Sequence, residues 1–293
     1  MSSGPTSETD WPVGTLAILG LGVMGGSIAR GAAGRAARTV VGWSPDPAER
    51  ADALAVGAVD DNPADWRDAV ARADLVVLAT PMRAAVSMLP ELARVAGSDS
   101  TFTDVASLKE PMARAASLAG LSHRWVGSHP MAGSEKSGFA ASRHDLVDGA
   151  RVWTVLGDAD AHRVKLVERF WETLGGVPVR IGAGEHDRLM AGASHLPQLT
   201  ATALARVLAD REVAFGDLGP GGRDMTRLAQ SDPTMWGDLL HEPPDSLSEG
   251  LRALAEELQR LAGFVENRDV ASIQATMVRG GAWRGGAVSG GGT

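Results

Sequence analysis

A glycine-rich turn near the start of the chain limits its possible folds more than any other feature. The apolar run Thr15-Leu-Ala-Ile-Leu leads directly into Gly-Leu-Gly-Val-Met-Gly at residues 20–25, and a helical pattern follows. In such a context Gly20 permits a tight turn, Gly22 leaves room for a pyrophosphate, and Gly25 lets the helix pack closely on the strand. The first N–H groups of the helix are then free to bind phosphate. The turn therefore predicts a dinucleotide-binding β-α-β unit.

The end of the second predicted strand, residues 39–43, is where such folds recognise the adenosine ribose. A carboxylate there accepts hydrogen bonds from both ribose hydroxyls and repels a 2′-phosphate. This chain has Ser44 at that position and Asp46 two residues later, with no arginine directly after Ser44. The pattern favours NAD and leaves NADP as an alternative. A glycine turn that serves packing alone, or that binds another nucleotide-like ligand, also stays open.

Strand and helix patterns alternate along the chain up to about residue 181. The expected strands after the first are 39–43, 73–80, 101–104, 124–127, 151–156 and 177–181, and the expected helices are 23–34, 47–56, 84–96, 109–119 and 161–174. The proline inside 84–96 is expected to kink or split that helix. The segment 73–80 is apolar throughout and ends at Pro81, as a buried parallel strand does. The alternation predicts an α/β fold with a Rossmann-type, doubly wound parallel sheet.

No strand pattern follows Ile181. A helical pattern runs from Glu185 to Phe215 with an expected kink or break at Pro197, and residues 247–267 carry apolar side chains at helical spacing. This predicts an all-helical dimerisation domain and a homodimer, with an intramolecular bundle as the alternative. We expect a disordered tail at 1–13, a dinucleotide-binding domain at 14–181, a helical substrate and dimerisation domain at 182–279, and a flexible tail at 280–293.

Composition excludes several classes of function. The chain has no cysteine, which excludes disulfides, thiolate metal sites and a cysteine nucleophile. Its net charge is −8 and it has no long basic run, so neither nucleic acid nor a membrane surface is an expected partner. No stretch approaches the ~18 apolar residues that a membrane span needs. The first residues lack the apolar run of a signal peptide, so a cytoplasmic location is expected.

Polar clusters follow the predicted strands at their carboxyl ends, where open α/β sheets bind ligands. They are 103–109, 127–135, 186–187 with 194–198, and 221–236. Oxidation of an alcohol needs a base for the hydroxyl proton, and histidine is suited to this near neutral pH. His129 follows a predicted strand, Ser107 is a candidate to orient its ring, and Arg227 offers two donors to a substrate carboxylate.

Each of these residues also has a purely structural interpretation. His129 can be an ordinary hydrogen-bonded histidine, and His195 lies inside a helical pattern. Arg227 can pair with Asp224 across one helical turn, and Trp236 can be a core residue. The spacing of His123, His129, His186 and His195 is not that of metal ligands, so no metal site is predicted.

The sequence resembles the prephenate/arogenate dehydrogenase family. The motifs occur in the family's order: GLGVMGGS, TDVASLK, GSHPMAGSEKSG, HD followed by ASHLPQ, and RDMTRLAQSDPTMW. The resemblance implies a dinucleotide domain followed by a helical dimerisation domain. It also implies oxidative decarboxylation of prephenate to 4-hydroxyphenylpyruvate, with hydride transfer to NAD, in tyrosine biosynthesis. An arogenate or dual cyclohexadienyl dehydrogenase, and NADP as cofactor, are the alternatives.

The resemblance also implies roles for single residues. His129 would take the proton of the ring hydroxyl, and Ser107 would bind both His129 and that hydroxyl. Many members that use prephenate have a histidine where this chain has Gln198, so the choice between prephenate and arogenate stays open. The expected substrate-binding residues are Arg227, His195, Glu135, Gln198, Ser134 and Trp236, some of them reaching the site from the partner subunit. The expected cofactor-binding residues are Gly20, Gly22, Val23, Met24, Gly25, Ser44, Asp46, Thr80, Pro81 and Asp104.

Two other classes of function compete with this interpretation. A β-hydroxyacid dehydrogenase would share the glycine-rich turn but needs a lysine in its second domain, and no lysine follows Lys165. A nucleotide-binding protein without activity would bind the cofactor but would not convert a substrate. The presence of His129, Ser107 and Arg227 argues against the second class.

Overall fold

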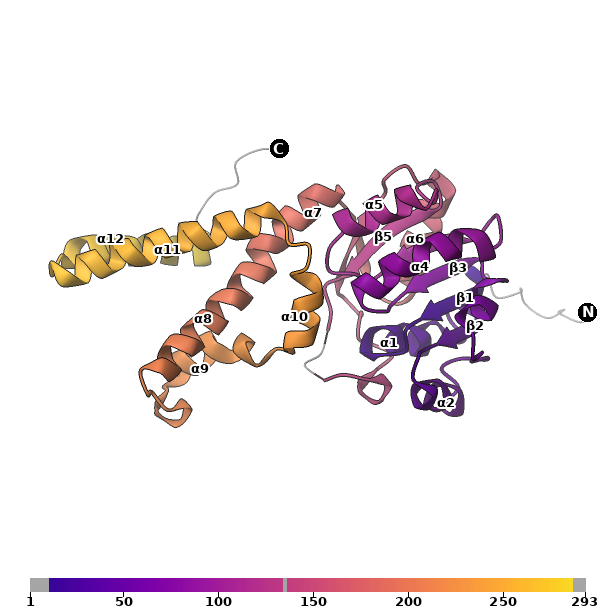
Figure 1. Ribbon diagram of the computed structural model, residues 1–293, viewed down its shortest axis with the longest axis horizontal. Helices are drawn as coiled ribbons and strands as arrows, with labels where there is room; N and C mark the ends of the chain where they lie inside the picture. Colours follow the sequence, from indigo (N-terminus) through magenta and orange to yellow (C-terminus); the bar gives the residue numbers. More distant parts are fainter. Residues whose placement is uncertain (1–10, 134–135, 287–293) are drawn as a thin grey trace, which may run out of the picture.

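The computed structural model describes residues 11–133 and 136–286 of the 293-residue chain. An α/β domain comes first and an elongated helical domain follows it (Figure 1). Residues 1–10 of the tail predicted at 1–13, and residues 287–293 of the tail predicted at 280–293, lie outside the described residues. No helix of the described part has the length and apolarity to cross a membrane.

A seven-stranded sheet forms the first domain, in the order β2-β1-β3-β4-β5-β6-β7. Its strands are β1 (Val13–Leu19), β2 (Ala37–Trp43), β3 (Leu75–Leu78), β4 (Thr101–Asp104), β5 (Trp125–Pro130), β6 (Arg151–Val155) and β7 (Val177–Arg180). The strand order reverses beside β1, so the glycine-rich turn that follows β1 lies next to the end of β3. Open sheets bind their ligands at such a reversal.

The prediction of a parallel sheet is correct for β1 to β5 but wrong for β5 and β6, which pair antiparallel. Parallel pairing needs a long crossover, usually a helix. The described residues between β5 and β6 contain no α-helix, only the 3₁₀ turn Phe139–Ala141. Helix α6 (Ala161–Thr173) does supply a crossover, and β7 is accordingly parallel to β6.

Helices cover both faces of the sheet, as the doubly wound fold requires. They are α1 (Val23–Ala32), α2 (Pro47–Ala55), α3 (Trp66–Val70), α4 (Met82–Val95), α5 (Glu110–Leu118) and α6. Because side chains of a strand alternate between faces, Leu16 and Ile18 pack in the cluster with α1 and α6, whereas Ala17 and Leu19 pack with α3, α4 and α5. Helix α4 continues through Pro90 and is not split there.

The second domain contains helices only. They are α7 (Ala183–Met190), α8 (Leu196–Asp210), α9 (Pro220–Thr226), α10 (Pro233–Leu239), α11 (Asp245–Glu266) and α12 (Val270–Arg284). The break expected near Pro197 is a single π-helical turn, Ala191–His195, directly before α8. Proline lacks the N–H that would continue the regular hydrogen-bond ladder. Helix α8 ends before Phe215, because Glu212 adopts a left-handed φ of 58°.

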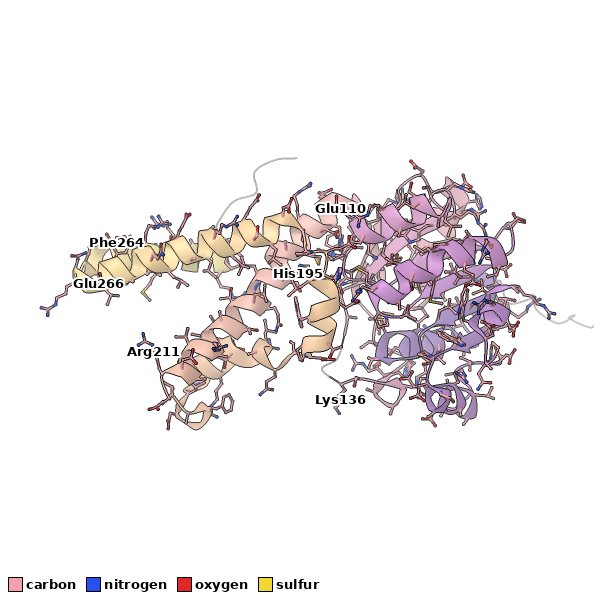
Figure 2. All side chains as sticks on the ribbon, viewed as in Figure 1. Glu110, Lys136, His195, Arg211, Phe264 and Glu266 are labelled. Carbon is pink, nitrogen blue, oxygen red and sulfur yellow. The ribbon has the colours of Figure 1, made fainter. Side chains whose placement is uncertain are left out.

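Helices α11 and α12 extend away from the α/β domain as an arm (Figure 1). His195 lies where the two domains meet, whereas Phe264 lies near the far end of the arm (Figure 2). Large apolar side chains on the arm are exposed, Met277 at 70% and Trp283 at 71%. Helix α12 ends at Arg284, so residues 280–284, which were predicted to belong to a flexible tail, are helical. The two glycines at 280 and 281 weaken this helix without ending it.

Candidate active site

The glycine-rich turn has the geometry of a pyrophosphate site. Gly20 has a φ of 101°, and a Cβ there would lie 2.6 Å from the carbonyl oxygen of Ala79. A Cβ on Gly25 would lie 1.8 Å from the carbonyl oxygen of Gly20. At Gly22 a Cβ would meet nothing within 4 Å, and no side chain caps the start of α1 there. Two glycines are thus required by packing, while the third faces open space beside free N–H groups, which fits a dinucleotide.

A carboxylate does stand at the end of β2, but it comes from Glu49. The Ser44 hydroxyl donates to Glu49 Oε2 over 2.6 Å. Asp46 instead caps α2, with its side chain accepting from the Ala48 N–H over 2.8 Å. Arg50 donates to the Ser44 carbonyl oxygen at the same corner. Sequence reasoning missed Glu49, although its place in the first turn of the helix that follows β2 was the available signal.

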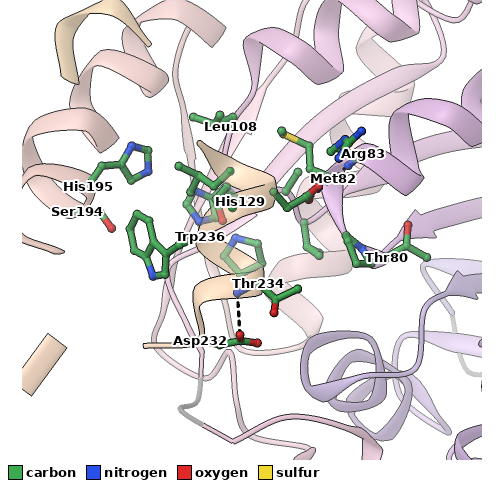
Figure 3. A pocket seen from close by; sticks show the side chains of 18 of the residues that line it. Thr80, Met82, Arg83, Leu108, His129, Ser194, His195, Asp232, Thr234 and Trp236 are labelled. Atoms are coloured by element: carbon green, nitrogen blue, oxygen red, sulfur yellow. Dashed lines mark hydrogen bonds between the residues drawn. The ribbon is translucent and has the colours of Figure 1, made fainter. Parts of the chain in front are cut away.

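A cavity of about 740 Å³ lies between the carboxyl ends of β3, β4 and β5 and the helical domain. Its walls come from residues 80–83, 105–108 and 129–132, and from 194–195 and 232–239 of the second domain. Six predicted site residues line it: Thr80, Pro81, Ser107, His129, His195 and Trp236. Figure 3 shows His129 near the centre, with His195 and Trp236 to one side and Thr80 to the other.

His129 is part of β5 rather than of the loop after it, because its backbone pairs with Trp153 of β6. Its Nδ1 lies 2.9 Å from Nε2 of His186, on α7. Ser107 was expected to orient this ring. It lines the same cavity, but the partner of Nδ1 is His186, so a contact between Ser107 and the other ring nitrogen stays a prediction.

His186 is itself held by a carboxylate. Its Nδ1 lies 2.7 Å from Oδ1 of Asp187. The two oxygens of Asp187 accept the backbone N–H groups of Lys109 and Glu110, at 2.8 and 2.9 Å, where α5 begins. His186 is fully buried and Asp187 nearly so. The sequence shows the pair His186-Asp187 next to a predicted helix but does not reveal these contacts.

The Asp104 side chain does not line the cavity. It is fully buried and forms an ion pair with Lys109, which is also fully buried. The Trp125 indole N–H donates to the second carboxylate oxygen over 3.0 Å. Lys109 Nζ also donates to the carbonyl oxygen of Ser128 over 2.6 Å, directly before His129. The Asp104 carboxylate, predicted to contact the cofactor, therefore has both of its oxygens occupied in the core.

The electrostatics of the site favour a neutral His129. Burial, followed by the positive charge of Lys109 and the neighbouring His186 and His195, lowers the pKa of His129 well below its usual 6.5. Burial also lowers the pKa of His195. Burial lowers the pKa of Lys109 and raises that of Asp104, while their mutual attraction opposes both shifts. An unprotonated imidazole is the form that can accept a proton.

Three buried polar atoms at the cavity have no hydrogen-bond partner among the described residues. They are Thr80 Oγ1, His195 Nδ1 and Trp236 Nε1. The rings of His195 and Trp236 pack edge to face at 5.7 Å between centroids. Buried polar groups normally form hydrogen bonds, so these atoms suit a polar ligand.

Four other predicted residues lie elsewhere or outside the described residues. The Arg227 side chain is 72% exposed, does not line the cavity, and lies 3.9 Å from Asp224. Gln198 is buried, donates to the Leu228 carbonyl oxygen over 2.7 Å and accepts the Ser231 hydroxyl over 3.0 Å. Ser134 and Glu135 lie outside the described residues. No group of three or more His, Asp or Glu side chains in the described part is arranged to hold a metal ion.

Two family models match this chain. The first, described as the nucleotide-binding domain of prephenate dehydrogenase, matches residues 30–180. The second, described as the dimerization domain of prephenate dehydrogenase, matches residues 182–279. Together they cover most of the chain and both of its structural domains.

Individual proteins show the same likeness. Prephenate dehydrogenase of Bacillus subtilis is 30% identical over 269 residues, which cover 88% of this chain and 72% of that protein. Cyclohexadienyl dehydrogenase of Zymomonas mobilis is 30% identical over 271 residues, 87% of this chain and 89% of that protein. The crystal structure of prephenate dehydrogenase from A. aeolicus with hydroxyphenyl propionate and NAD+ superposes with a TM-score of 0.84, at 29% identity over 92% of this chain and 97% of that one.

Proposed function

The chain belongs to the prephenate dehydrogenase family, and on that premise we propose that it oxidatively decarboxylates prephenate to 4-hydroxyphenylpyruvate with NAD. The observation that carries the proposal is the place of His129, a partly buried imidazole that is hydrogen-bonded to His186 at the wall of a cavity that also reaches Thr80, next to Gly20. We propose residues 14–181 as the cofactor domain and 182–279 as the substrate and dimerisation domain.

His129 is the proposed base. In its neutral form it accepts the proton of the ring hydroxyl as the carbon–hydrogen bond breaks. When bound, NAD accepts the hydride. The ring carboxylate then leaves as carbon dioxide and the ring becomes aromatic, so the protein mainly positions the substrate and keeps water away. Ser107, His195 and Trp236 offer polar atoms around the hydroxyl and ring. Arg227 does not line this cavity in the single chain, and we propose that it binds a substrate carboxylate in the dimer.

The described residues fit the cofactor at three places. Gly22 leaves space beside the start of α1 for the pyrophosphate, and the Thr80 hydroxyl is a free polar group on the nicotinamide side. Glu49, hydrogen-bonded to Ser44, presents a carboxylate where the adenosine ribose is recognised. This carboxylate favours NAD. Arg50, at the same corner, is the feature that favours NADP as the second candidate.

A Glu49→Gln variant tests the choice of cofactor. It keeps a hydrogen-bond partner for Ser44 but removes the charge that repels a 2′-phosphate. We expect the ratio of kcat/KM with NAD to that with NADP to fall by about tenfold, since a charged hydrogen bond contributes roughly 1.5–3 kcal/mol. Asp46→Asn is the matched control, because Asp46 only caps α2 in this structure. A ratio that changes with Asp46→Asn and not with Glu49→Gln would assign the ribose to Asp46.

The substrate is the finer part of the proposal. Rates measured with prephenate and with arogenate, each with NAD and NADP, should be highest for prephenate with NAD. Comparable rates with arogenate would identify a cyclohexadienyl dehydrogenase, the name given to the Zymomonas mobilis relative. A folded protein that binds NAD but turns over neither substrate would refute the enzymatic function.

A homodimer is the proposed assembly. The exposed apolar side chains of the arm, including Met277 and Val278 of α12, need a covering surface that the single chain does not provide. We expect light scattering to give twice the chain mass, and Val278→Asp to shift the protein toward monomer. Leu118→Asp, at a side chain 84% exposed on α5, is the control and should stay dimeric. A wild-type protein that is monomeric at micromolar concentration would contradict the proposal.

A further inference from the structure

A chain of hydrogen bonds leads from the cavity into the boundary between the two domains. It runs from His129 Nδ1 to His186 Nε2 over 2.9 Å, and from His186 Nδ1 to Asp187 Oδ1 over 2.7 Å. It ends at the N–H groups of Lys109 and Glu110, which donate to the Asp187 carboxylate. His186 and Asp187 are almost completely buried, so these hydrogen bonds lie in the interior of the protein and not at its surface.

The hydrogen bonds that Asp187 accepts determine which ring nitrogens of His186 and His129 carry the protons. The Asp187 carboxylate accepts two backbone N–H groups at the start of α5, where the helix dipole favours a negative charge. An ionised carboxylate only accepts hydrogen bonds, so Nδ1 of His186 must carry the proton that lies between them. In neutral His186 the other nitrogen, Nε2, is then an acceptor. Nδ1 of His129 must therefore be the donor, and Nε2 of His129 keeps its lone pair.

We propose that His186 and Asp187 are positioning residues that hold His129 in the Nδ1–H tautomer and take up positive charge when that base is protonated. The inference rests on the proposed function, in which His129 is the base. The inference adds to that function a role for α7 of the helical domain, which orients a base that belongs to the nucleotide domain.

The proton transfers balance along this path. The substrate O–H bond breaks and an Nε2–H bond forms on His129, while the electron pair left on oxygen forms the C=O bond as hydride leaves for NAD. When the C–C bond to the ring carboxylate breaks, its electron pair makes the ring aromatic, and the oxygen takes back the proton to form the phenol. The Nδ1–H bond of His129 then lengthens or breaks toward Nε2 of His186. Positive charge is thereby moved to an imidazole that lies 2.7 Å from a carboxylate.

The groups around His129 make a positive charge on its ring unfavourable, so sharing that charge with His186 stabilises the protonated base. Among the described residues, Lys109, His186 and His195 are the titratable groups that act on its ring, and all three disfavour a positive charge there. In the core, Asp104 neutralises the charge of Lys109. Asp187 is the carboxylate that binds His186. Trp153 packs edge to face against the His186 ring at 6.5 Å between centroids, and His186 is fully buried.

Nitrogen-15 NMR of the histidine rings tests the tautomer without any turnover. His129→Asn identifies the His129 signals among those of the seven histidines. In the wild-type protein at alkaline pH we expect Nδ1 to be protonated and Nε2 to be bare, and we expect His186→Phe to shift this preference. A wild-type His129 with its proton on Nε2 would overturn the inference. Failure of the proposed function would appear separately, as absence of turnover with both substrates.

Kinetics test the second half of the inference. His186→Gln retains an acceptor for Nδ1 but cannot carry charge, and we expect kcat to fall about 10–100-fold while the KM for NAD is unchanged, as for other residues that orient an active group. Asp187→Asn should also move the acid limb of kcat to lower pH, because an imidazolium on His129 loses its carboxylate. Asp269→Asn, which removes a capping carboxylate from α12, is the control and should leave both quantities unchanged. A wild-type kcat in His186→Gln would overturn the charge-sharing role, even if Asp187→Asn fails to fold.

Discussion

Replacing His129 by asparagine is expected to lower kcat by about 10²–10⁴-fold, the usual contribution of a positioned acid or base. Asparagine retains a polar group of similar size next to His186 but cannot accept a proton at the cavity. Binding of NAD should not change, because the glycine-rich turn and Glu49 lie away from this side chain. Single-turnover rates and NAD titrations by tryptophan fluorescence measure the two quantities separately.

His123→Asn is the matched control for this experiment, since His123 is exposed and does not line the cavity. It should retain wild-type rates. His195→Asn removes a cavity histidine whose proposed role is to contact the substrate, and we expect it to raise KM more than it lowers kcat. If His129→Asn is as fast as the wild type, the base is another residue.

Replacing Lys109 by methionine is expected to be the most destabilising single change at the site, by about 3–5 kcal/mol. The change leaves the Asp104 carboxylate uncompensated in the core and removes the donor to the Ser128 carbonyl oxygen. Urea denaturation measures the loss in the free energy of unfolding. The combined variant Lys109→Met with Asp104→Asn should recover part of it, because no unpaired charge remains buried.

Lys165→Met is the control for the loss of a lysine. Lys165 is exposed on α6, and such surface changes usually stay within about 0.5 kcal/mol. If the free energy of unfolding is the same for Lys109→Met and Lys165→Met, the buried ion pair does not stabilise this fold in the way that its geometry indicates.

The parts of the fold that the sequence predicts well are those with a local cause. The turn at Gly20 and Gly25 needs glycine for steric reasons, and the apolar strand β3 is buried on both faces. The direction of β6 has no local cause, because it depends on how the chain between β5 and β6 folds back. The sequence therefore predicts the strand but not its pairing.

The site divides in the same way. His129 follows from the pattern of its motif, and the structure places it at the cavity. His186 lies 57 positions away in sequence and reaches His129 only when α7 packs beside β5. Asp104 has the same residue type and strand-end position as a ligand-binding carboxylate, yet Lys109 pairs with it in the core. Spacing alone does not distinguish an acidic residue that faces a ligand from one that neutralises a buried cation.

The position of His186 and Asp187 just after the domain boundary has a consequence for how this protein can evolve. The first domain contains the proposed base, but the two side chains proposed to orient it belong to α7 of the second. A recombination that replaced the helical half by one without this histidine and aspartate would leave the nucleotide half able to bind its cofactor but slower in the proposed reaction. Selection on the rate of this reaction therefore acts on both halves as one heritable unit.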